Sequence, residues 1–247
     1  MKPEDSIISS ARIEQLSVRK AFLIDGHPLY LDGYCSLLKA LGPPPQELNL
    51  IDKANKLDPK SLPNHSRDIA ILDIYSIGNR GLELLIDMRI NAPDLKIIIA
   101  TAPQESFLID WCLALGVAGY IPKSTPKQVM LRALRKITRG ERWTPDLEHQ
   151  SEQDQALQTP KAGASMHLTQ KEITTLKYLV LGMVNRDIAE KMHVTESTTK
   201  SHVSAIIRKL GVINRTQVFT EYQRINNPSN QFTRSLRKIQ IRHSEVA

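Results

Sequence analysis

Cysteine is scarce in this 247-residue chain, which contains Cys35 and Cys112 and no others. Each lies within an apolar pattern of helical spacing, so we expect two buried free thiols and neither a disulfide nor a metal-binding Cys/His cluster. Long apolar runs are also missing, and the stretch from Leu95 to Ala102 is far too short to cross a bilayer. The N-terminus carries Glu4 and Asp5, where a secretion signal would be basic and then apolar. These absences argue against a membrane partner and predict a cytoplasmic protein.

Charge is distributed unevenly along the chain. Residues 161–247 hold 14 Lys and Arg against 6 Asp and Glu, whereas the residues before them are close to neutral. The net charge of +7 and the pI of about 9.4 therefore come from one end. Such a basic region predicts a polyanionic partner, because Lys and Arg that neutralise phosphates release condensed counterions. The alternative is a charged face that only keeps the protein soluble.

Apolar runs alternate with amphipathic stretches between Arg19 and Trp143. This alternation predicts an α/β domain with five parallel strands and helices on both faces, in a flavodoxin-like order. The candidate strands are Ala21–Ile24, Leu48–Ile51, Ile69–Leu72, Ile97–Ala100 and Gly119–Ile121. The candidate helices are Leu31–Leu41, Leu82–Ile90, Phe107–Leu115 and Lys127–Thr138. Pro59 and Pro63 leave room for little more than a turn or two of helix in the second crossover.

Four polar residues stand at the carboxyl ends of four candidate strands: Asp25, Asp73, Thr101 and Lys123. In such a fold the functional site lies at these strand ends, so we expect the four side chains to meet. The sequence blocks that contain them resemble the receiver domain of bacterial two-component response regulators over roughly half of the chain. These blocks are Phe22–Leu29, Ile71–Asp73, Gly81–Glu83, Ala100–Ala102 and Gly119–Lys123.

The receiver resemblance implies a role for each of these positions. Asp73 would be the phosphoacceptor, supplied by a sensor histidine kinase. Thr101 would bond the phosphoryl group, Lys123 would be its cationic partner, and Tyr120 would report the switch. The resemblance also implies Mg²⁺, because a cation must offset the charge on the phosphoryl oxygens.

The acidic pair that helps to hold Mg²⁺ in the family reads Asp25-Gly26 here. Glycine offers no side-chain oxygen to a hard cation, so we expect Asp25 and Asp73 to bind Mg²⁺ weakly. Ser76-Ile77 also stands where the family usually has Met-Pro. Two hypotheses stay open: a receiver controlled by phosphorylation, and a pseudo-receiver that only dimerises or binds a partner or ligand.

Residues 144–166 contain few large apolar side chains, which predicts a flexible tether that lets two domains reorient. The predicted organisation is an N-terminal extension (1–18), the receiver (19–143), the tether (144–166), a helix-turn-helix domain (167–224) and a basic tail (225–247).

The helix-turn-helix domain is predicted to be all-α, with four short helices. Thr169 and Glu172 have the spacing of a capping box at the first helix, and Asn185 is the expected cap of the second. In the third helix an apolar stripe at helical spacing consists of Val203, Ile206, Ile207 and Leu210. That stripe turns the opposite face outward: Ser197, Ser201, Ser204 and Arg208, with Lys200 on one flank and Thr198, His202 and Lys209 towards the other.

This region closely resembles the LuxR/NarL/FixJ-type helix-turn-helix in the blocks Leu168–Glu172, Asn185–Ala189, Val194–His202 and Lys209–Thr216. The resemblance implies binding of double-stranded DNA. Lys200, Ser201 and Ser204 would contact bases or nearby phosphates, and Thr198, Arg208 and Lys209 would hold the DNA backbone. The fourth helix, around Gln217 to Tyr222, would form a homodimer, with a heterodimer as the alternative.

The sequence thus predicts a sequence-specific transcriptional regulator and not an enzyme. A phosphotransfer enzyme with Asp73 as nucleophile is disfavoured, because the site lacks an acid that such chemistry needs. An interaction domain that never touches DNA is disfavoured too, because apolar packing alone does not require so basic an outer face.

Overall fold

The computed structural model describes residues 18–77, 80–102, 106–145 and 167–226. Almost all of the predicted N-terminal extension, most of the tether and nearly the whole basic tail lie outside the described residues.

The predicted fold class is confirmed: a five-stranded parallel sheet with helices is followed by a helical domain. The strands are β1 (Lys20–Ile24), β2 (Glu47–Ile51), β3 (Ile69–Leu72), β4 (Lys96–Thr101) and β5 (Gly119–Pro122), in the order β2-β1-β3-β4-β5. The helices of this domain are α2 (Pro28–Leu41), α3 (Gly81–Asn91), α4 (Ser106–Ala114) and α5 (Lys127–Thr138). Helix α2 begins three residues before the predicted start, because proline fits the first turn of a helix.

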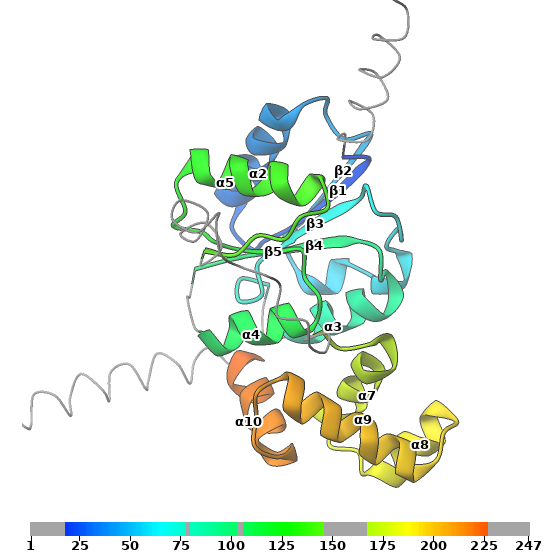
Figure 1. Ribbon diagram of the computed structural model, residues 1–247. Coiled ribbons are helices and arrows are strands. Elements are labelled where there is room, and N and C mark those ends of the chain that lie inside the picture. Colours follow the sequence, from blue (N-terminus) through cyan, green and yellow to red (C-terminus); the bar gives the residue numbers. More distant parts are fainter. Residues whose placement is uncertain (1–17, 78–79, 103–105, 146–166, 227–247) are drawn as a thin grey trace, which may run out of the picture.

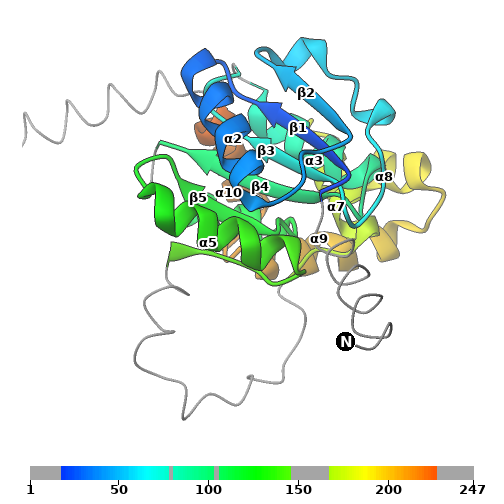
Figure 2. The same cartoon turned by 90° about the horizontal axis from the view of Figure 1, so that it is seen from above.

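The sheet separates two layers of helices (Figures 1 and 2). Helices α2 and α5 cover one face, and α3 and α4 cover the other. In β3 the alternating side chains divide between the layers, with Ile69 and Ile71 in the α2/α5 core and Ala70 and Leu72 in the α3/α4 core. Because both faces of β3 are buried, this strand reads as a continuous apolar run.

The crossover from β2 to β3 contains two short 3₁₀ turns, η1 (Ala54–Lys56) and η2 (Pro59–Ser61). Asp58 caps η2 by accepting a hydrogen bond from Lys60 N at 3.0 Å. This agrees with the expectation that the prolines leave room for only a turn or two of helix.

The helical domain, called the head below, consists of α7 (Gln170–Val180), α8 (Asn185–Met192), α9 (Glu196–Lys209) and α10 (Arg215–Asn226). The predicted capping box is present, with the Thr169 hydroxyl and the Glu172 carboxylate each accepting the other residue's backbone N–H. The prediction that Asn185 caps α8 is wrong. Val184 occupies the cap position, and the Asn185 side-chain oxygen instead accepts a hydrogen bond from Arg215 at 3.0 Å.

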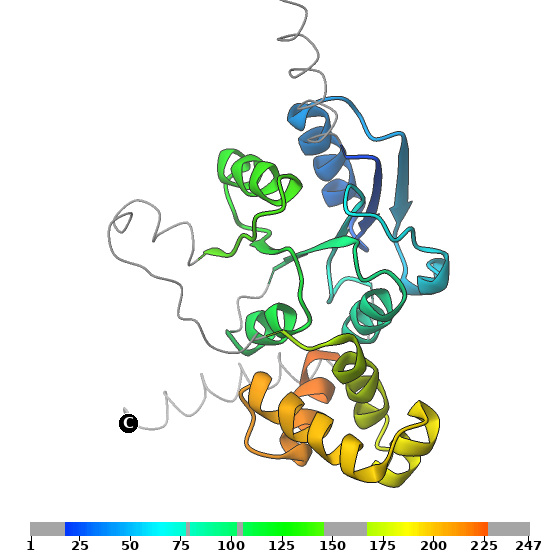
Figure 3. The ribbon, with the colours of Figure 1, turned by 45° about the vertical axis from the view of Figure 1, so that its right-hand side comes forward.

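The head packs against α3 and α4 of the first domain (Figures 1 and 3). Buried residues of α3, α4, α7, α9 and α10 belong to one continuous apolar cluster. The structure has the two domains docked, a contact that the sequence did not predict. Tether composition could not reveal this contact, because docking depends on surfaces at either side of the tether. The flexibility of the tether stays a prediction, because residues 146–166 lie outside the described residues.

No helix within the described residues has both the length and the hydropathy needed to cross a membrane.

Candidate functional site

The carboxyl ends of the strands carry a buried ion cluster. Lys123 lies just beyond β5, and its Nζ is 2.6 Å from Asp25 Oδ2 and 2.6 Å from Asp73 Oδ2. The three side chains are almost inaccessible, at 4% exposed for Lys123, 0% for Asp25 and 4% for Asp73. The parallel sheet brings them together, because β1 and β3 are neighbours and Asp73 N donates to Ile24 O at 2.9 Å. The cluster has one formal negative charge in excess.

Every oxygen of the two carboxylates has a donor. Asp73 Oδ1 accepts from the Thr101 hydroxyl at 2.8 Å and from Tyr75 N at 3.0 Å. Asp25 Oδ1 accepts from His27 N at 2.9 Å and lies 3.0 Å from His27 Nδ1. Because the remaining oxygens bind Lys123, the cluster is satisfied internally, which burial of charge requires.

Two tyrosines of α2 close this cluster on one side. Tyr30 presents its ring to the Lys123 ammonium, 4.0 Å from the ring centroid, an attractive cation–π geometry. The Tyr34 hydroxyl is 3.5 Å from Asp25 Oδ2, and burial together with that carboxylate raises the pKa of Tyr34. Tyr120, the predicted switch residue, is fully buried on β5.

The surroundings of Gly26 do not fit a Mg²⁺ site. Gly26 N donates to the Ser76 hydroxyl at 2.8 Å, and a Cβ at position 26 would overlap the backbone oxygen of Ser76. The loop after β3 therefore occupies the space that an acidic side chain at position 26 would need. Asp25, His27 and Asp73 could each offer one ligand atom within 4.8 Å of the others. A divalent cation would nevertheless have to displace the donors that these carboxylates already hold.

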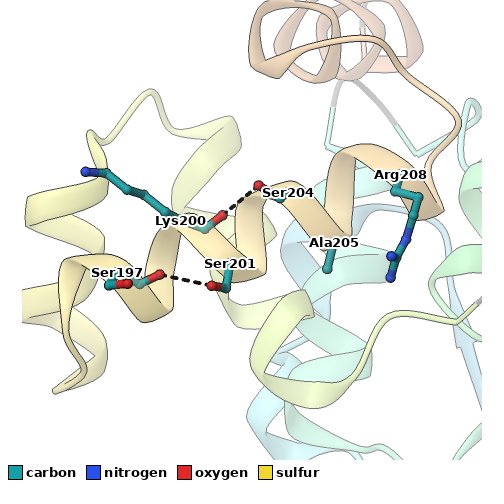
Figure 4. A pocket seen from close by; sticks show the side chains of 6 residues that line it. All are labelled: Ser197, Lys200, Ser201, Ser204, Ala205 and Arg208. Carbon is teal, nitrogen blue, oxygen red and sulfur yellow. Dashed lines mark hydrogen bonds between the residues drawn. The ribbon is translucent and has the colours of Figure 1, made fainter.

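The outer face of α9 consists of Ser197, Lys200, Ser201, Ser204 and Arg208, all of them exposed. They line an open pocket along one side of the helix, and Figure 4 shows them in a row with Lys200 and Arg208 extending beyond the hydroxyls. Ser201 and Ser204 donate to carbonyl oxygens one turn earlier, at 3.1 and 3.0 Å. Lys200 pairs with Glu196 at 3.0 Å, but both side chains are exposed, so this pair is weak and leaves Lys200 available.

Two residues that the sequence grouped with the phosphate contacts have protein partners. Lys209 Nζ donates to Glu172 Oε2 at 2.7 Å and to His167 O at 2.8 Å, with 11% of its side chain exposed. The Thr198 hydroxyl lies 2.8 Å from that of Thr195, the cap of α9. Burial opposes ionisation of Glu172, but the bonds from Lys209 and Thr169 outweigh it and lower the pKa of Glu172.

Sequence reasoning missed several residues that shape these sites: His27, Tyr30, Tyr34, Ser76 and Glu172 as the partner of Lys209. For the tyrosines a signal existed, because Tyr30 and Tyr34 are four residues apart and share one face of α2. Ser76 and Glu172 gave none, since they meet partners 50 and 37 residues away.

Known proteins resemble both parts of the chain. The family described as "Bacterial regulatory proteins, luxR family" matches residues 166–221. The DNA-binding transcriptional activator DevR/DosR of Mycobacterium tuberculosis is 32% identical over 222 residues, covering 85% of this chain and 98% of that protein. The chain belongs to the LuxR-type response regulators. This family pairs a receiver with a LuxR-type helix-turn-helix and consists of DNA-binding transcription regulators.

Other relatives of this response regulator span a similar length. The glycerol metabolism activator of Pseudomonas putida is 29% identical over 204 residues, covering 80% of this chain and 92% of that protein. The nitrate/nitrite response regulator protein NarP of Escherichia coli is 28% identical over 203 residues, covering 79% and 90%. Among solved structures, RcsB from Salmonella enterica serovar Typhimurium bound to promoter rprA is 21% identical with a TM-score of 0.45, covering 83% and 98%.

Proposed function

We propose that this response regulator binds double-stranded DNA in a sequence-specific manner through the outer face of α9 and controls transcription as a cytoplasmic homodimer. The observation that carries the proposal is the composition of that face, which presents three exposed hydroxyls together with two exposed cations. Short hydroxyls suit base edges and phosphates at close range, and long cations suit phosphates or guanine. We assign base or nearby phosphate contacts to Lys200, Ser201 and Ser204, and a backbone contact to Arg208.

A salt titration tests the DNA interface. A duplex is first selected from a random pool with the wild-type protein, and its affinity is then measured across salt concentrations. Lys200→Ala and Arg208→Ala should each weaken binding and reduce the slope of log affinity against log salt by about 1, since each removes one phosphate-neutralising cation. Lys171→Ala is the matched control, because Lys171 is an exposed cation on α7 and is not among the residues that line the pocket on the outer face of α9. Unchanged slopes for both α9 variants would refute the assignment.

For the receiver, the geometry favours a domain that works without Mg²⁺-dependent phosphorylation. Lys123 already pairs with both Asp25 and Asp73 at 2.6 Å, and the Gly26–Ser76 contact occupies the place of the second acid. A phosphoryl group on Asp73 would add negative charge with only one lysine to offset it. We therefore propose that the receiver is a docking and dimerisation domain, and that Asp73, Thr101 and Lys123 form a structural cluster.

Incubation with acetyl phosphate and Mg²⁺ distinguishes this proposal from the alternative, a receiver that is controlled by phosphorylation of Asp73. Intact-mass measurement should show no stable phosphoryl adduct, and Asp73→Asn should leave DNA affinity within about twofold of wild type. The conservative amide keeps the shape of the carboxylate while removing its nucleophile. A stable Asp73 adduct that shifts DNA affinity would instead establish Asp73 as the phosphoacceptor, supplied by a histidine kinase.

A further inference from the structure

The head supplies hydrogen-bond partners to both ends of receiver helix α3. Gln170 Nε2 donates to the carbonyl oxygens of Arg89 at 3.1 Å and Ile90 at 2.8 Å, in the last turn of α3. At the opposite end, Asn226 Oδ1 accepts from Leu82 N at 3.3 Å. A helix leaves backbone groups without intrahelical partners at each end. Residues from two different helices of the head therefore cap α3 across the domain boundary.

The C-terminal end of α4 is bonded to the head in the same way. Leu168 N donates to Ala114 O at 2.7 Å, and His167 Nδ1 lies 2.6 Å from Leu113 O. A carbonyl oxygen only accepts, so His167 Nδ1 is the donor. Burial and the nearby cations, Arg142 foremost among them, lower the pKa of His167 and favour this neutral ring at neutral pH.

Side chains strengthen the same contact. Lys177 Nζ of α7 is 2.6 Å from Asp87 Oδ1 of α3. The Arg224 guanidinium of α10 stacks 3.5 Å above the ring centroid of Phe107 in α4. Together with the continuous apolar cluster, these contacts join the two domains through both apolar packing and polar side chains.

Docking leaves the outer face of α9 uncovered. The head residues that make these contacts lie just before or on α7 and at the end of α10, and none of them belongs to that face. Ser197, Lys200, Ser201, Ser204 and Arg208 stay exposed in the docked arrangement. The receiver and the proposed DNA contact thus use different surfaces of the head.

We propose that the receiver and the head remain docked through the α3–α4 and α7–α10 contact when the protein binds DNA, so that both domains meet the duplex as one body. The proposal rests on the proposed DNA-binding function. The same contact connects the ion cluster of the receiver to the head. Thr101 at the end of β4 bonds Asp73 at 2.8 Å, and α4, which follows β4 in the chain, is bonded to the head at its C-terminal end.

A cleavable cross-link tests the proposal. Asp87→Cys and Lys177→Cys are combined with Cys35→Ser, which leaves the net charge unchanged because one charge of each sign is removed; Cys112 is fully buried. A bismaleimide with a disulfide in its bridge joins the two new thiols and is later opened by a reductant. Affinity for the selected duplex is measured before and after opening.

The locked and opened proteins should bind with affinities within about twofold of each other. A loss of more than about tenfold on locking, restored by the reductant, would overturn the proposal, because DNA binding would then require undocking. Failure of both the opened protein and the wild type to bind any duplex would refute the DNA-binding function itself.

A second variant weakens the docking contact without changing the net charge, whereas the cross-link locks that contact. Gln170→Ala with Asn226→Ala removes the bonds to both ends of α3, and scattering should show a larger radius of gyration. Affinity should stay equal or fall, whereas a gain of more than about tenfold would mean that docking inhibits DNA binding and would overturn the proposal. Asn91→Ala is the matched control, since this exposed amide on α3 bonds Asp87 O within its own helix.

Discussion

At the scale of single residues, Lys209 and Arg208 are neighbours with different tasks. Arg208 is exposed on the outer face of α9, while Lys209 is bonded to Glu172 and to His167 O. A buried ion pair that loses one partner leaves the other charge unsatisfied. We therefore expect Lys209 to position α9 against α7 and Arg208 to make the phosphate contact.

Lys209→Met should lower the free energy of unfolding by about 3 kcal/mol in denaturant titrations, because Glu172 would stay buried without its cation. The salt dependence of DNA binding by the folded variant should stay that of the wild type. Arg208→Ala should behave in the opposite way, with a stability change below about 0.5 kcal/mol and a reduced salt slope. A reduced slope for Lys209→Met would place Lys209 at the DNA instead.

Gly26 makes a second residue-scale prediction. Gly26→Ala should lower the free energy of unfolding by about 1–3 kcal/mol, because its Cβ would overlap the backbone oxygen of Ser76, which cannot rotate away as a side chain can. Gly26→Asp should share this loss and should not create a Mg²⁺ site in calorimetric titration.

The matched control is Gly33→Ala. Gly33 lies within α2, and a Cβ there would meet no atom of another element within 4 Å, so alanine should raise stability by up to about 1 kcal/mol through helix propensity. If Gly26→Ala and the wild type were equally stable, the loop after β3 would be able to move away from the new Cβ. The space that an acidic side chain at position 26 needs would then be available.

At the scale of elements, local patterns predicted most of the fold. Alternation placed β3 and α5 at their observed bounds, and the capping box located the start of α7, because these signals depend on neighbouring residues. The meeting of Asp25, Asp73, Thr101 and Lys123 followed from parallel topology alone. The sequence could not predict that Lys209 reaches Glu172 or that Ser76 fills the space beside Gly26, because periodicity gives a direction and not a partner.

The hydrogen-bond partners of the helix ends could not be predicted from the sequence either. The pattern predicted where α3 and α4 lie but not which groups satisfy their terminal amides and carbonyls, since those partners belong to the head. The prediction that Asn185 caps α8 fails for a related reason, because its side chain bonds Arg215 of α10 and not the backbone of α8. Caps formed within a segment are readable from sequence, whereas caps formed between distant segments require the fold.

At the scale of the whole molecule, docking should make unfolding cooperative. The α3/α4 core of the receiver continues into the core of the head, so loss of either domain exposes apolar surface of the other. We expect calorimetry of the full chain to show a single transition, with the calorimetric enthalpy equal to the van't Hoff enthalpy.

A receiver fragment that ends at residue 145 should melt at a lower temperature than the full chain, because α3 and α4 lose their caps. Gln170→Ala with Asn226→Ala should move the full chain part of the way towards the fragment, while Asn91→Ala should not. Two transitions at the temperatures of the separate domains would show that the cross-domain caps contribute nothing to stability, and would leave the tether as the only link between the domains.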